Sequence, residues 1–271
     1  MTKFELPTAS EESGVFVQPI ADISDDFIRG MDASAVLAVE NSGAKYYGFD
    51  GEEQDVFKTL AEAGVNYIRL RVWNDPYDEN GNGYGGGNND VATAIELGKR
   101  ATQYGMKVCI DFHYSDFWAE PAVQLIPKAW KKDVNNTEKM CSDVYDFTKE
   151  SIQKFKDAGA NIGMVQVGNE ITNGLLGIYS NRDKGESFNV IWGDKKKSTE
   201  VNKYLKAGIK AVREYTPQAL VALHLETPNV WKYKTIMNTW KRDNVDYDVL
   251  GSSYYPFWSI AAKANTPKTL K

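Results

Sequence analysis

Short apolar runs alternate with longer amphipathic segments along most of this chain, and that alternation limits the possible folds more than any other feature. Six runs are short and rich in Val, Ile, Leu or aromatic residues, as buried parallel strands are. They lie at 27–31, 67–72, 107–112, 162–167, 220–225 and 249–253. The segments 50–64, 88–105, 135–159 and 198–217 between them carry helix caps and terminators. Repeated strand–helix units predict a parallel sheet with helices outside it.

Polar and aromatic residues follow the C-terminal end of nearly every predicted strand, which favours a barrel over an open sheet. A doubly wound sheet concentrates its ligand groups at one switch point, whereas barrel enzymes build their sites from all the strand ends. The residues are Asp32, Trp73-Asn74-Asp75, His113-Tyr114-Ser115-Asp116, Asn169-Glu170, His224 with Glu226, and Tyr254 to Trp258. We therefore expect an α/β fold of the TIM-barrel type rather than an open sheet.

The length of 271 residues fits one barrel as well as two smaller domains. Residues 1–26 are polar with few periodic apolar positions, so we interpret them as an N-terminal leader and assign residues 27–271 to one barrel domain.

The composition argues against several classes of function. The net charge is −5 and the sequence has no basic stripe, which argues against a nucleic-acid partner. No apolar run reaches the roughly 20 residues of a membrane span. The glycine-rich stretch 81–89 lacks the lysine of a phosphate-binding loop.

The segment IGMVQVGNEI, a buried strand ending in Asn169-Glu170, is the sharpest catalytic signal. A glutamate at a strand end points into the mouth of a barrel, where burial raises its pKa and keeps it protonated as an acid. The neighbouring asparagine can hydrogen-bond a sugar hydroxyl in the transition state of glycoside hydrolysis. The alternative is that the pair merely begins a helix, with the glutamate as a cap. The histidines and aromatic residues of the other strand ends favour the catalytic interpretation.

Five stretches of the chain resemble the family 53 glycoside hydrolases, the arabinogalactan endo-β-1,4-galactanases. They are RVWNDPYDENGNGYGGGNND, DFHYSDFWAEP, MVQVGNE, VALH and DYDVLGSSYYPFW, in that order. The resemblance implies a (β/α)8 barrel, secretion, and retaining hydrolysis of β-1,4-galactan with Glu170 as the acid/base. It implies a substrate cleft built from Asn169, Trp73, Asn74, Asp75, His113, Asp116, Trp118, His224, Tyr254 and Trp258. We expect no cofactor and no metal, since His113 and His224 alone do not make a metal site. A signal peptide is not visible at residues 1–14.

The resemblance also implies a second carboxylate that this sequence is not expected to supply. A retaining glycosidase needs two carboxyl groups roughly 5 to 5.5 Å apart, and in the family the nucleophile is a glutamate at the end of the seventh strand. Lys271 follows soon after the sixth predicted strand, so we expect a barrel truncated there, with no nucleophile in the chain. Glu226 is interpreted as a solvated or capping glutamate rather than a substitute.

A barrel that does not close has two further consequences. Its first and last strands would present unpaired edges, so we expect self-association through them. Hydrolysis by such a chain is doubtful, which leaves a second interpretation open: a catalytically inactive galactan-binding protein that keeps the aromatic cleft.

Overall fold

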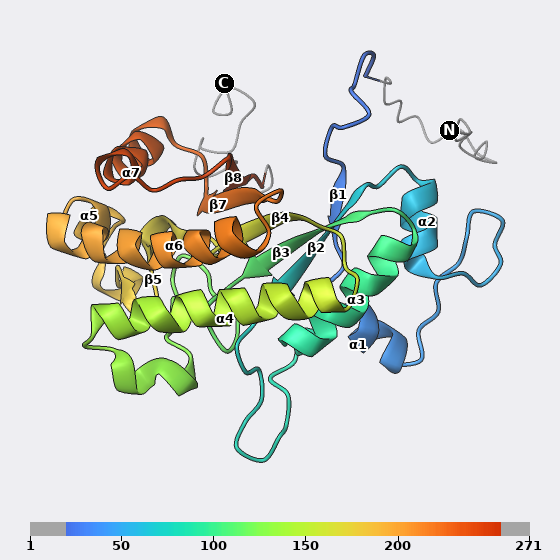
Figure 1. The fold of residues 1–271 in the computed structure, drawn as a ribbon, viewed down its shortest axis with the longest axis horizontal. Helices are drawn as coiled ribbons and strands as arrows, with labels where there is room; N and C mark the ends of the chain where they lie inside the picture. The colour runs from blue at the N-terminus through green and yellow to red at the C-terminus, as the bar shows by residue number, and fades with distance from the viewer. Residues whose placement is uncertain (1–19, 256–271) are drawn as a thin grey trace.

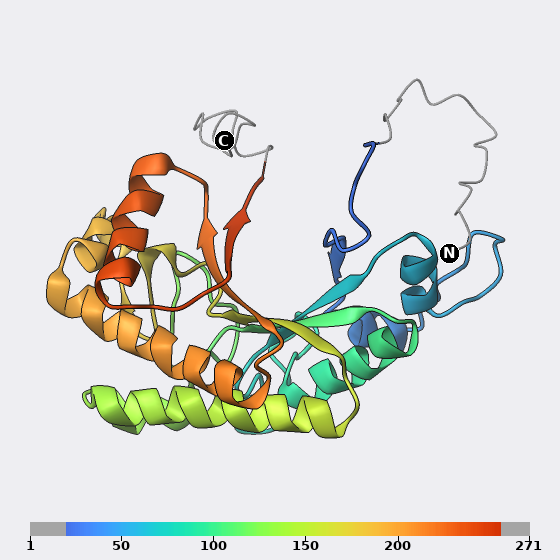
Figure 2. The ribbon, with the colours of Figure 1, turned by 45° about the horizontal axis from the view of Figure 1, so that its top comes forward.

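The computed structural model describes residues 20–255, and its centre is a six-stranded parallel sheet with the order β1-β2-β3-β4-β7-β8 (Figure 1). The strands are β1 (Gly30–Asp32), β2 (Tyr67–Val72), β3 (Lys107–Phe112), β4 (Ile162–Val167), β7 (Leu220–Glu226) and β8 (Val249–Ser253). The order of these six strands in the sheet is the same as their order in the sequence. The sheet curls strongly (Figure 2). A doubly wound sheet would reverse its order at a switch point. The expected barrel-type architecture with six strands is therefore confirmed.

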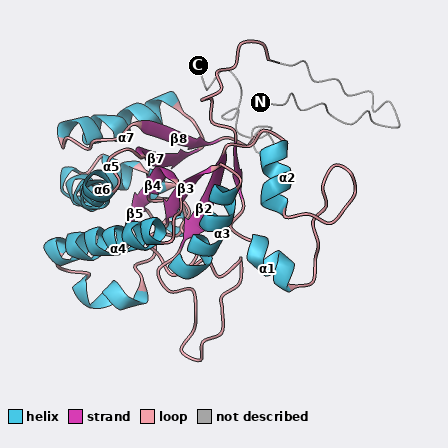
Figure 3. Ribbon diagram, turned by 45° about the vertical axis from the view of Figure 1, so that its right-hand side comes forward, coloured by secondary structure: helices cyan, strands magenta, loops and turns pink. Residues whose placement is uncertain are grey.

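Helices cover the convex face of the curled sheet (Figures 2 and 3). They are α1 (Val36–Asn41), α2 (Val56–Glu62), α3 (Val91–Gln103), α4 (Thr137–Asp157), α5 (Asn189–Trp192), α6 (Lys195–Tyr215) and α7 (Val230–Arg242). The long helices α4 and α6 pack along each other, and α3 packs on β2 and β3. Smaller elements follow β4: the 3-10 turns η2 (Ile171–Asn173) and η3 (Arg182–Lys184), and a hairpin of β5 (Gly174–Leu175) and β6 (Ile178–Tyr179). A third 3-10 turn, η1 (Lys128–Asp133), precedes α4.

Capping side chains set where the helices begin. Asp90 accepts a hydrogen bond from the backbone of Thr93, and Asn136 caps α4 in the same way. The expected starts of two other helices are wrong. The helix placed at 198–217 begins three residues earlier because Asp194 caps the backbone N–H groups of residues 196 and 197, and the helix placed at 50–64 begins only after its cap, Asp55. The first strand is also displaced, from 27–31 to Gly30–Asp32.

The two faces of the sheet differ in chemistry. Outward-facing residues such as Ile68, Leu70 and Ile110 are fully buried in the apolar core beneath the helices. The inner face carries a small apolar layer of Tyr67, Cys109, Met164, Ala222 and Val249 near the strand starts. Side chains alternate along a strand, so the next inward positions are two residues further on. Four of these five positions are polar, namely Arg69, Asp111, Gln166 and His224, and the fifth is Gly251. This change from apolar to polar inside the curl places the polar groups at the C-terminal ends of the strands.

Residues 20–26, the described part of the expected leader, are exposed. None of the helices within residues 20–255 has the length and apolar character needed to cross a membrane.

Candidate active site

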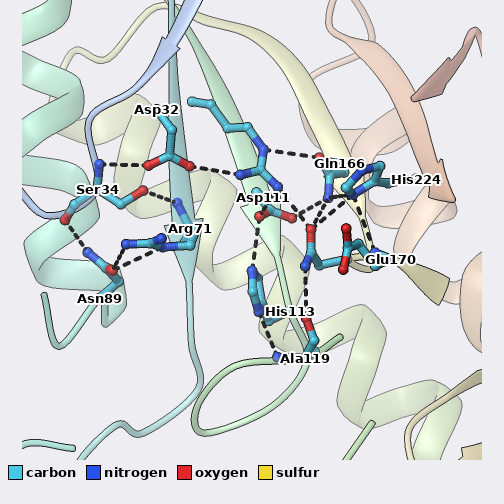
Figure 4. Close-up of polar contacts among 12 residues, drawn as sticks. Asp32, Ser34, Arg71, Asn89, Asp111, His113, Ala119, Gln166, Glu170 and His224 are labelled. Atoms are coloured by element: carbon cyan, nitrogen blue, oxygen red, sulfur yellow. Dashed lines mark hydrogen bonds and ion pairs between the residues drawn. The ribbon is translucent and has the colours of Figure 1, made fainter. Parts of the chain in front are cut away.

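A cleft of about 690 Å³ opens at the C-terminal ends of the strands, on the concave side of the sheet. Its walls come from every strand of the sheet except β3, and from the loops that follow β3, β4 and β8. The lining side chains include Asp32, Arg69, Arg71, Trp118, Glu120, Gln166, Asn169, Glu170, His224, Ser253 and Tyr254. Figure 4 shows the polar contacts that join many of them.

Glu170 follows β4 and adopts a left-handed backbone conformation, with φ 48°. This conformation is uncommon for a non-glycine residue and carries strain, which is often found at functional positions. Its side chain makes no capping hydrogen bond to the turn that follows, so the capping interpretation is not supported. Burial raises the pKa of Glu170, and the negative charges of Glu226 and Glu120 add to the rise, while a hydrogen bond from Ser253 opposes it. The result is a carboxyl group that holds its proton to a higher pH than an exposed glutamate.

Asp111 on β3 is fully buried beneath the cleft and contacts three neighbours. Its carboxylate is 2.6 Å from the guanidinium of Arg69, 3.0 Å from Nε2 of His113, and accepts a hydrogen bond of 2.5 Å from the amide of Gln166. Burial alone would raise the pKa of Asp111, but the Arg69 charge and then His113 hold it below its usual value. Asp111 therefore keeps its negative charge to a lower pH than an exposed aspartate, and this charge positions Arg69, His113 and Gln166.

Asn169, the residue before Glu170, is buried and its amide orientation is fixed from both sides. Its side-chain oxygen accepts a hydrogen bond of 2.9 Å from Arg69, and its nitrogen donates one of 2.8 Å to the carbonyl of Ala119. Arg69 in turn donates to Asp32 on β1 at 2.8 Å. A chain of charge-assisted contacts thus runs across the cleft floor from β1 to the end of β4.

The structure brings five of the expected site residues together in the wall of the cleft: Asn169, Glu170, Trp118, His224 and Tyr254. Two others, Trp73 and His113, are buried beneath this wall. The ring of Trp73 packs edge-on against Trp118 with centroids 5.5 Å apart, and His113 packs against the same ring at 5.8 Å. They support the exposed indole from below.

Three expected residues do not line the cleft. Asp75 and Asp116 both contact Lys128: the Asp75 carboxylate lies 2.8 Å from its ammonium, and Asp116 accepts from its backbone N–H at 2.7 Å. The backbone N–H of Asn74 donates to the carbonyl of Ser115. These contacts hold the loops after β2 and β3 to each other. Trp258, the last expected substrate-binding residue, lies outside the described residues.

The two histidines lie in different surroundings. His113 is buried, with Nε2 facing Asp111 and Nδ1 accepting a hydrogen bond from the backbone of Ala119, so both of its nitrogens are occupied. Burial lowers the pKa of His224 to about 4, which makes its ring neutral above that pH. No group of three or more His, Cys, Asp or Glu side chains suited to a metal ion occurs between residues 20 and 255.

Sequence reasoning missed several residues of this site. Arg69, Arg71 and Gln166 lie inside predicted strands, and Ser253 ends the last one, so all were counted as strand and not as site. The available signal was their spacing, because Arg69 and Arg71 are two residues apart and therefore face the same side of β2. Polar side chains at alternate positions near a strand end indicate an interior that becomes polar.

Glu226 differs from its expected state. It is neither solvated nor capping: the residue is 8% exposed, and its carboxylate forms an ion pair of 3.1 Å with Lys232, which is 9% exposed. Burial lowers the pKa of Lys232, although the nearby Glu226 charge opposes the change. This buried pair sits at the end of β7 beside Glu170, whose pKa it influences.

Comparison with known proteins identifies relatives over most of the chain. The family model of glycosyl hydrolase family 53 matches residues 28–271. The endo-beta-1,4-galactanase of Bacillus subtilis (strain 168) is 49% identical over 245 residues, which are 90% of this chain and 53% of that protein. The arabinogalactan endo-beta-1,4-galactanase of Humicola insolens is 34% identical over 242 residues, 86% of this chain and 65% of that protein.

A solved structure has a closely similar fold. The GH53 catalytic domain from Ignisphaera aggregans matches with a TM-score of 0.80 and 38% identity, over 90% of this chain and 64% of that chain. The present chain thus spans between about half and two-thirds of the length of these relatives.

Proposed function

Because this chain belongs to glycosyl hydrolase family 53, we propose that its cleft serves the endo-acting hydrolysis of β-1,4-galactosidic linkages in galactan or arabinogalactan. The observation that carries the proposal is Glu170. It is a half-buried carboxyl group with a raised pKa, held at a strand end in the wall of the cleft. Galactanase activity in the relatives named above supports the choice of substrate.

In the proposed reaction Glu170 first acts as an acid and later as a base. It donates its proton to the glycosidic oxygen, and then accepts a proton from the attacking water in a retaining mechanism. Asn169 lies next to it and would hydrogen-bond the sugar 2-hydroxyl. The exposed ring of Trp118 and the side chain of Tyr254 would contact the apolar faces of the sugars.

We assign no nucleophile within residues 20–255. The mechanism needs a second carboxylate roughly 5 to 5.5 Å from the first. Glu226 is nearby, but it is buried, is paired with Lys232 and does not line the cleft. The family resemblance assigns this role to the end of a seventh strand, and the described sheet has six.

The substitution Glu170→Gln tests the role of the acid. We expect it to lower the rate of galactan hydrolysis by about 10²- to 10⁴-fold, the usual contribution of a general acid or base, while binding of galacto-oligosaccharides measured by calorimetry is retained. Glu150→Gln, at an exposed position on α4, is the matched control and should leave both quantities unchanged. Equal turnover in the wild type and Glu170→Gln would exclude Glu170 as the acid. Binding by the wild type without any hydrolysis would favour the galactan-binding function instead.

Two further parts of the proposal concern where the protein acts and how it assembles. Since galactan is an extracellular polymer, we propose that the protein acts outside the cell.

Within residues 20–255, β1 and β8 each have one neighbour in the sheet and one free edge. Met31 of β1 and the preceding Phe27 are exposed, so self-association through these edges is expected. Sedimentation velocity at increasing protein concentration checks this: a constant monomer would contradict it.

A further inference from the structure

The imidazole of His224 is connected to Glu170 through one hydroxyl group. Nε2 of His224 lies 2.9 Å from Oγ of Ser253, and the same oxygen is hydrogen-bonded to Oε1 of Glu170. The three residues come from the ends of β7, β8 and β4. A serine hydroxyl carries a single proton and can donate it to only one of these two neighbours at a time. The direction of this hydroxyl therefore depends on which neighbour needs a donor.

The opposite side of the His224 ring faces an acceptor and two donors at once. The side-chain oxygen of Asn169 lies 2.9 Å from Nδ1 and can accept a hydrogen bond from it when Nδ1 carries the proton. The backbone N–H of Glu170, at 3.3 Å, and the amide nitrogen of Gln166, at 3.2 Å, can donate to Nδ1 when it carries no proton. Both neutral tautomers of the ring consequently find partners in the same geometry.

We propose that Ser253 links the protonation state of Glu170 to the tautomer of His224, which makes Ser253 and His224 positioning residues for the proton transfer. The proposal rests on the acid/base role of Glu170 in the proposed function. When Glu170 is protonated, it donates to Ser253, Ser253 donates to Nε2, and the ring keeps its proton on Nδ1 against Asn169. When Glu170 is ionised, Ser253 donates to the carboxylate.

In that ionised state the unprotonated Nε2 would face a hydroxyl oxygen that no longer donates to it. The ring therefore carries its proton on Nε2, donates to Ser253, and accepts the backbone N–H of Glu170 at Nδ1. The ring loses the proton on Nδ1 and gains one on Nε2 by exchange with water, so its charge stays zero. The net change is the single proton that Glu170 releases. In both states the two ring nitrogens, the Ser253 hydroxyl and the Glu170 carboxyl group take part in hydrogen bonds, and the backbone N–H of Glu170 has Nδ1 as its acceptor in the ionised state.

The surrounding charges are compatible with a neutral ring. The titratable or charged groups that face His224 are Asp111, Arg69 and His113, and those that face Glu170 are Glu226, Glu120, Arg69 and Lys232. Burial sets the pKa of His224 at about 4, whereas the pKa of Glu170 is raised above its ordinary value. The pKa of His224 therefore lies below that of Glu170, and the ring is already neutral at the midpoint of the Glu170 titration.

Nitrogen-15 NMR of the histidine rings in the full chain tests the proposal directly. The chain has two histidines, and His113 serves as an internal reference because its contacts with Asp111 and Ala119 hold the proton on Nε2. Carbon-13 NMR of the carboxyl groups, with Glu170→Gln for assignment, locates the midpoint of Glu170. We expect His224 to carry its proton on Nδ1 below that midpoint and on Nε2 above it. One tautomer on both sides of the midpoint would overturn the proposal.

Substitutions at Ser253 separate this linkage from general support of the fold. Ser253→Ala removes the hydroxyl, so His224 should keep one tautomer through the titration of Glu170, while Ser253→Thr retains the hydroxyl and the switch. Glu170→Gln stays neutral and, with its amide N–H donating to Ser253, should hold the ring in the Nδ1–H form at every pH above about 4. An unchanged switch in Ser253→Ala would contradict the proposal. These readouts require no galactan hydrolysis, so the outcome is distinguishable from a failure of the proposed function.

Discussion

The carboxylate of Asp111 on β3 lies 2.6 Å from the guanidinium of Arg69 on β2, and the Asp111 side chain has no exposed surface. A buried charge of this kind is tolerated only when its partners remain in place. Arg69 also reaches Asp32 and Asn169, so the pair anchors a network that spans four strands. Loss of the Asp111 carboxylate would leave the guanidinium of Arg69 without its main counter-charge.

We expect Asp111→Asn to destabilise the protein by about 3–5 kcal/mol, the usual cost of removing one partner of a buried ion pair. The free energy of unfolding in urea measures the effect. Glu96→Gln is the control, since Glu96 forms an exposed pair with Lys99 at 3.7 Å on α3, and such pairs contribute about 0–1 kcal/mol. Equal losses in the two variants would show that the network does not depend on Asp111.

The same carboxyl group predicts a pH dependence of stability. The pKa of Asp111 is lower in the folded protein than in the unfolded chain, because the neighbouring Arg69 and His113 outweigh burial. Its contribution to stability is therefore fully present above the ordinary carboxyl value of about 4 and is lost as the pH falls through the lower folded value. The difference in unfolding free energy between the wild type and Asp111→Asn should shrink below about pH 4. A difference that stays constant from pH 7 to pH 3 would contradict this assignment.

The strands of this fold could be predicted from the sequence because their outward faces are apolar. In β2, Ile68, Leu70 and Val72 pack beneath helices, and they produced an apolar run with the bounds that the structure has. The inner face was harder to predict. Arg69 alternates with these residues and points to the concave face of the sheet. Its ion-pair and hydrogen-bond partners come from β1, β3 and the end of β4. Only the arrangement of the sheet shows which partners neutralise it.

The candidate site could be predicted where the residue follows a strand, and not where its role depends on distant contacts. Glu170 was recognisable as a strand-end carboxyl in an Asn-Glu pair. Ser253 was not, since its contact with Glu170 spans 83 positions in the sequence and exists only because β8 curls toward β4. Asp75 and Asp116 were assigned to the cleft because they follow strands, but the shared contact with Lys128 turns them toward each other. A loop residue's direction is set by such local partners.

The buried pair of Glu226 and Lys232 should tune the acidity of Glu170. The charge of Glu226 contributes to the raised pKa of Glu170, and the ammonium of Lys232 attracts both carboxylates. We expect Glu226→Gln to lower the pKa of Glu170 and Lys232→Met to raise it, as followed by carbon-13 NMR of the carboxyl group. The exposed Glu150→Gln variant should leave it unchanged. Shifts in the same direction for both substitutions would show that the pair acts through structure rather than charge.

Trp118 should provide a large part of the binding energy for the sugar chain. Its side chain is 40% exposed in the wall of the cleft, although its ring is held firmly from behind. Arg71 lies 4.2 Å from the ring centroid, and Trp73 packs against it edge-on. A ring that is already fixed loses little conformational freedom when a sugar stacks on it.

We expect Trp118→Ala to weaken the binding of galacto-oligosaccharides by roughly tenfold, or about 1.4 kcal/mol, and Trp118→Phe to weaken it less because a smaller aromatic face remains. Calorimetric titration measures both. Trp231→Ala is the matched control, since Trp231 is 60% exposed at the start of α7 and does not line the cleft. If the two alanine variants lose the same affinity, exposed tryptophan content rather than the position of Trp118 determines binding.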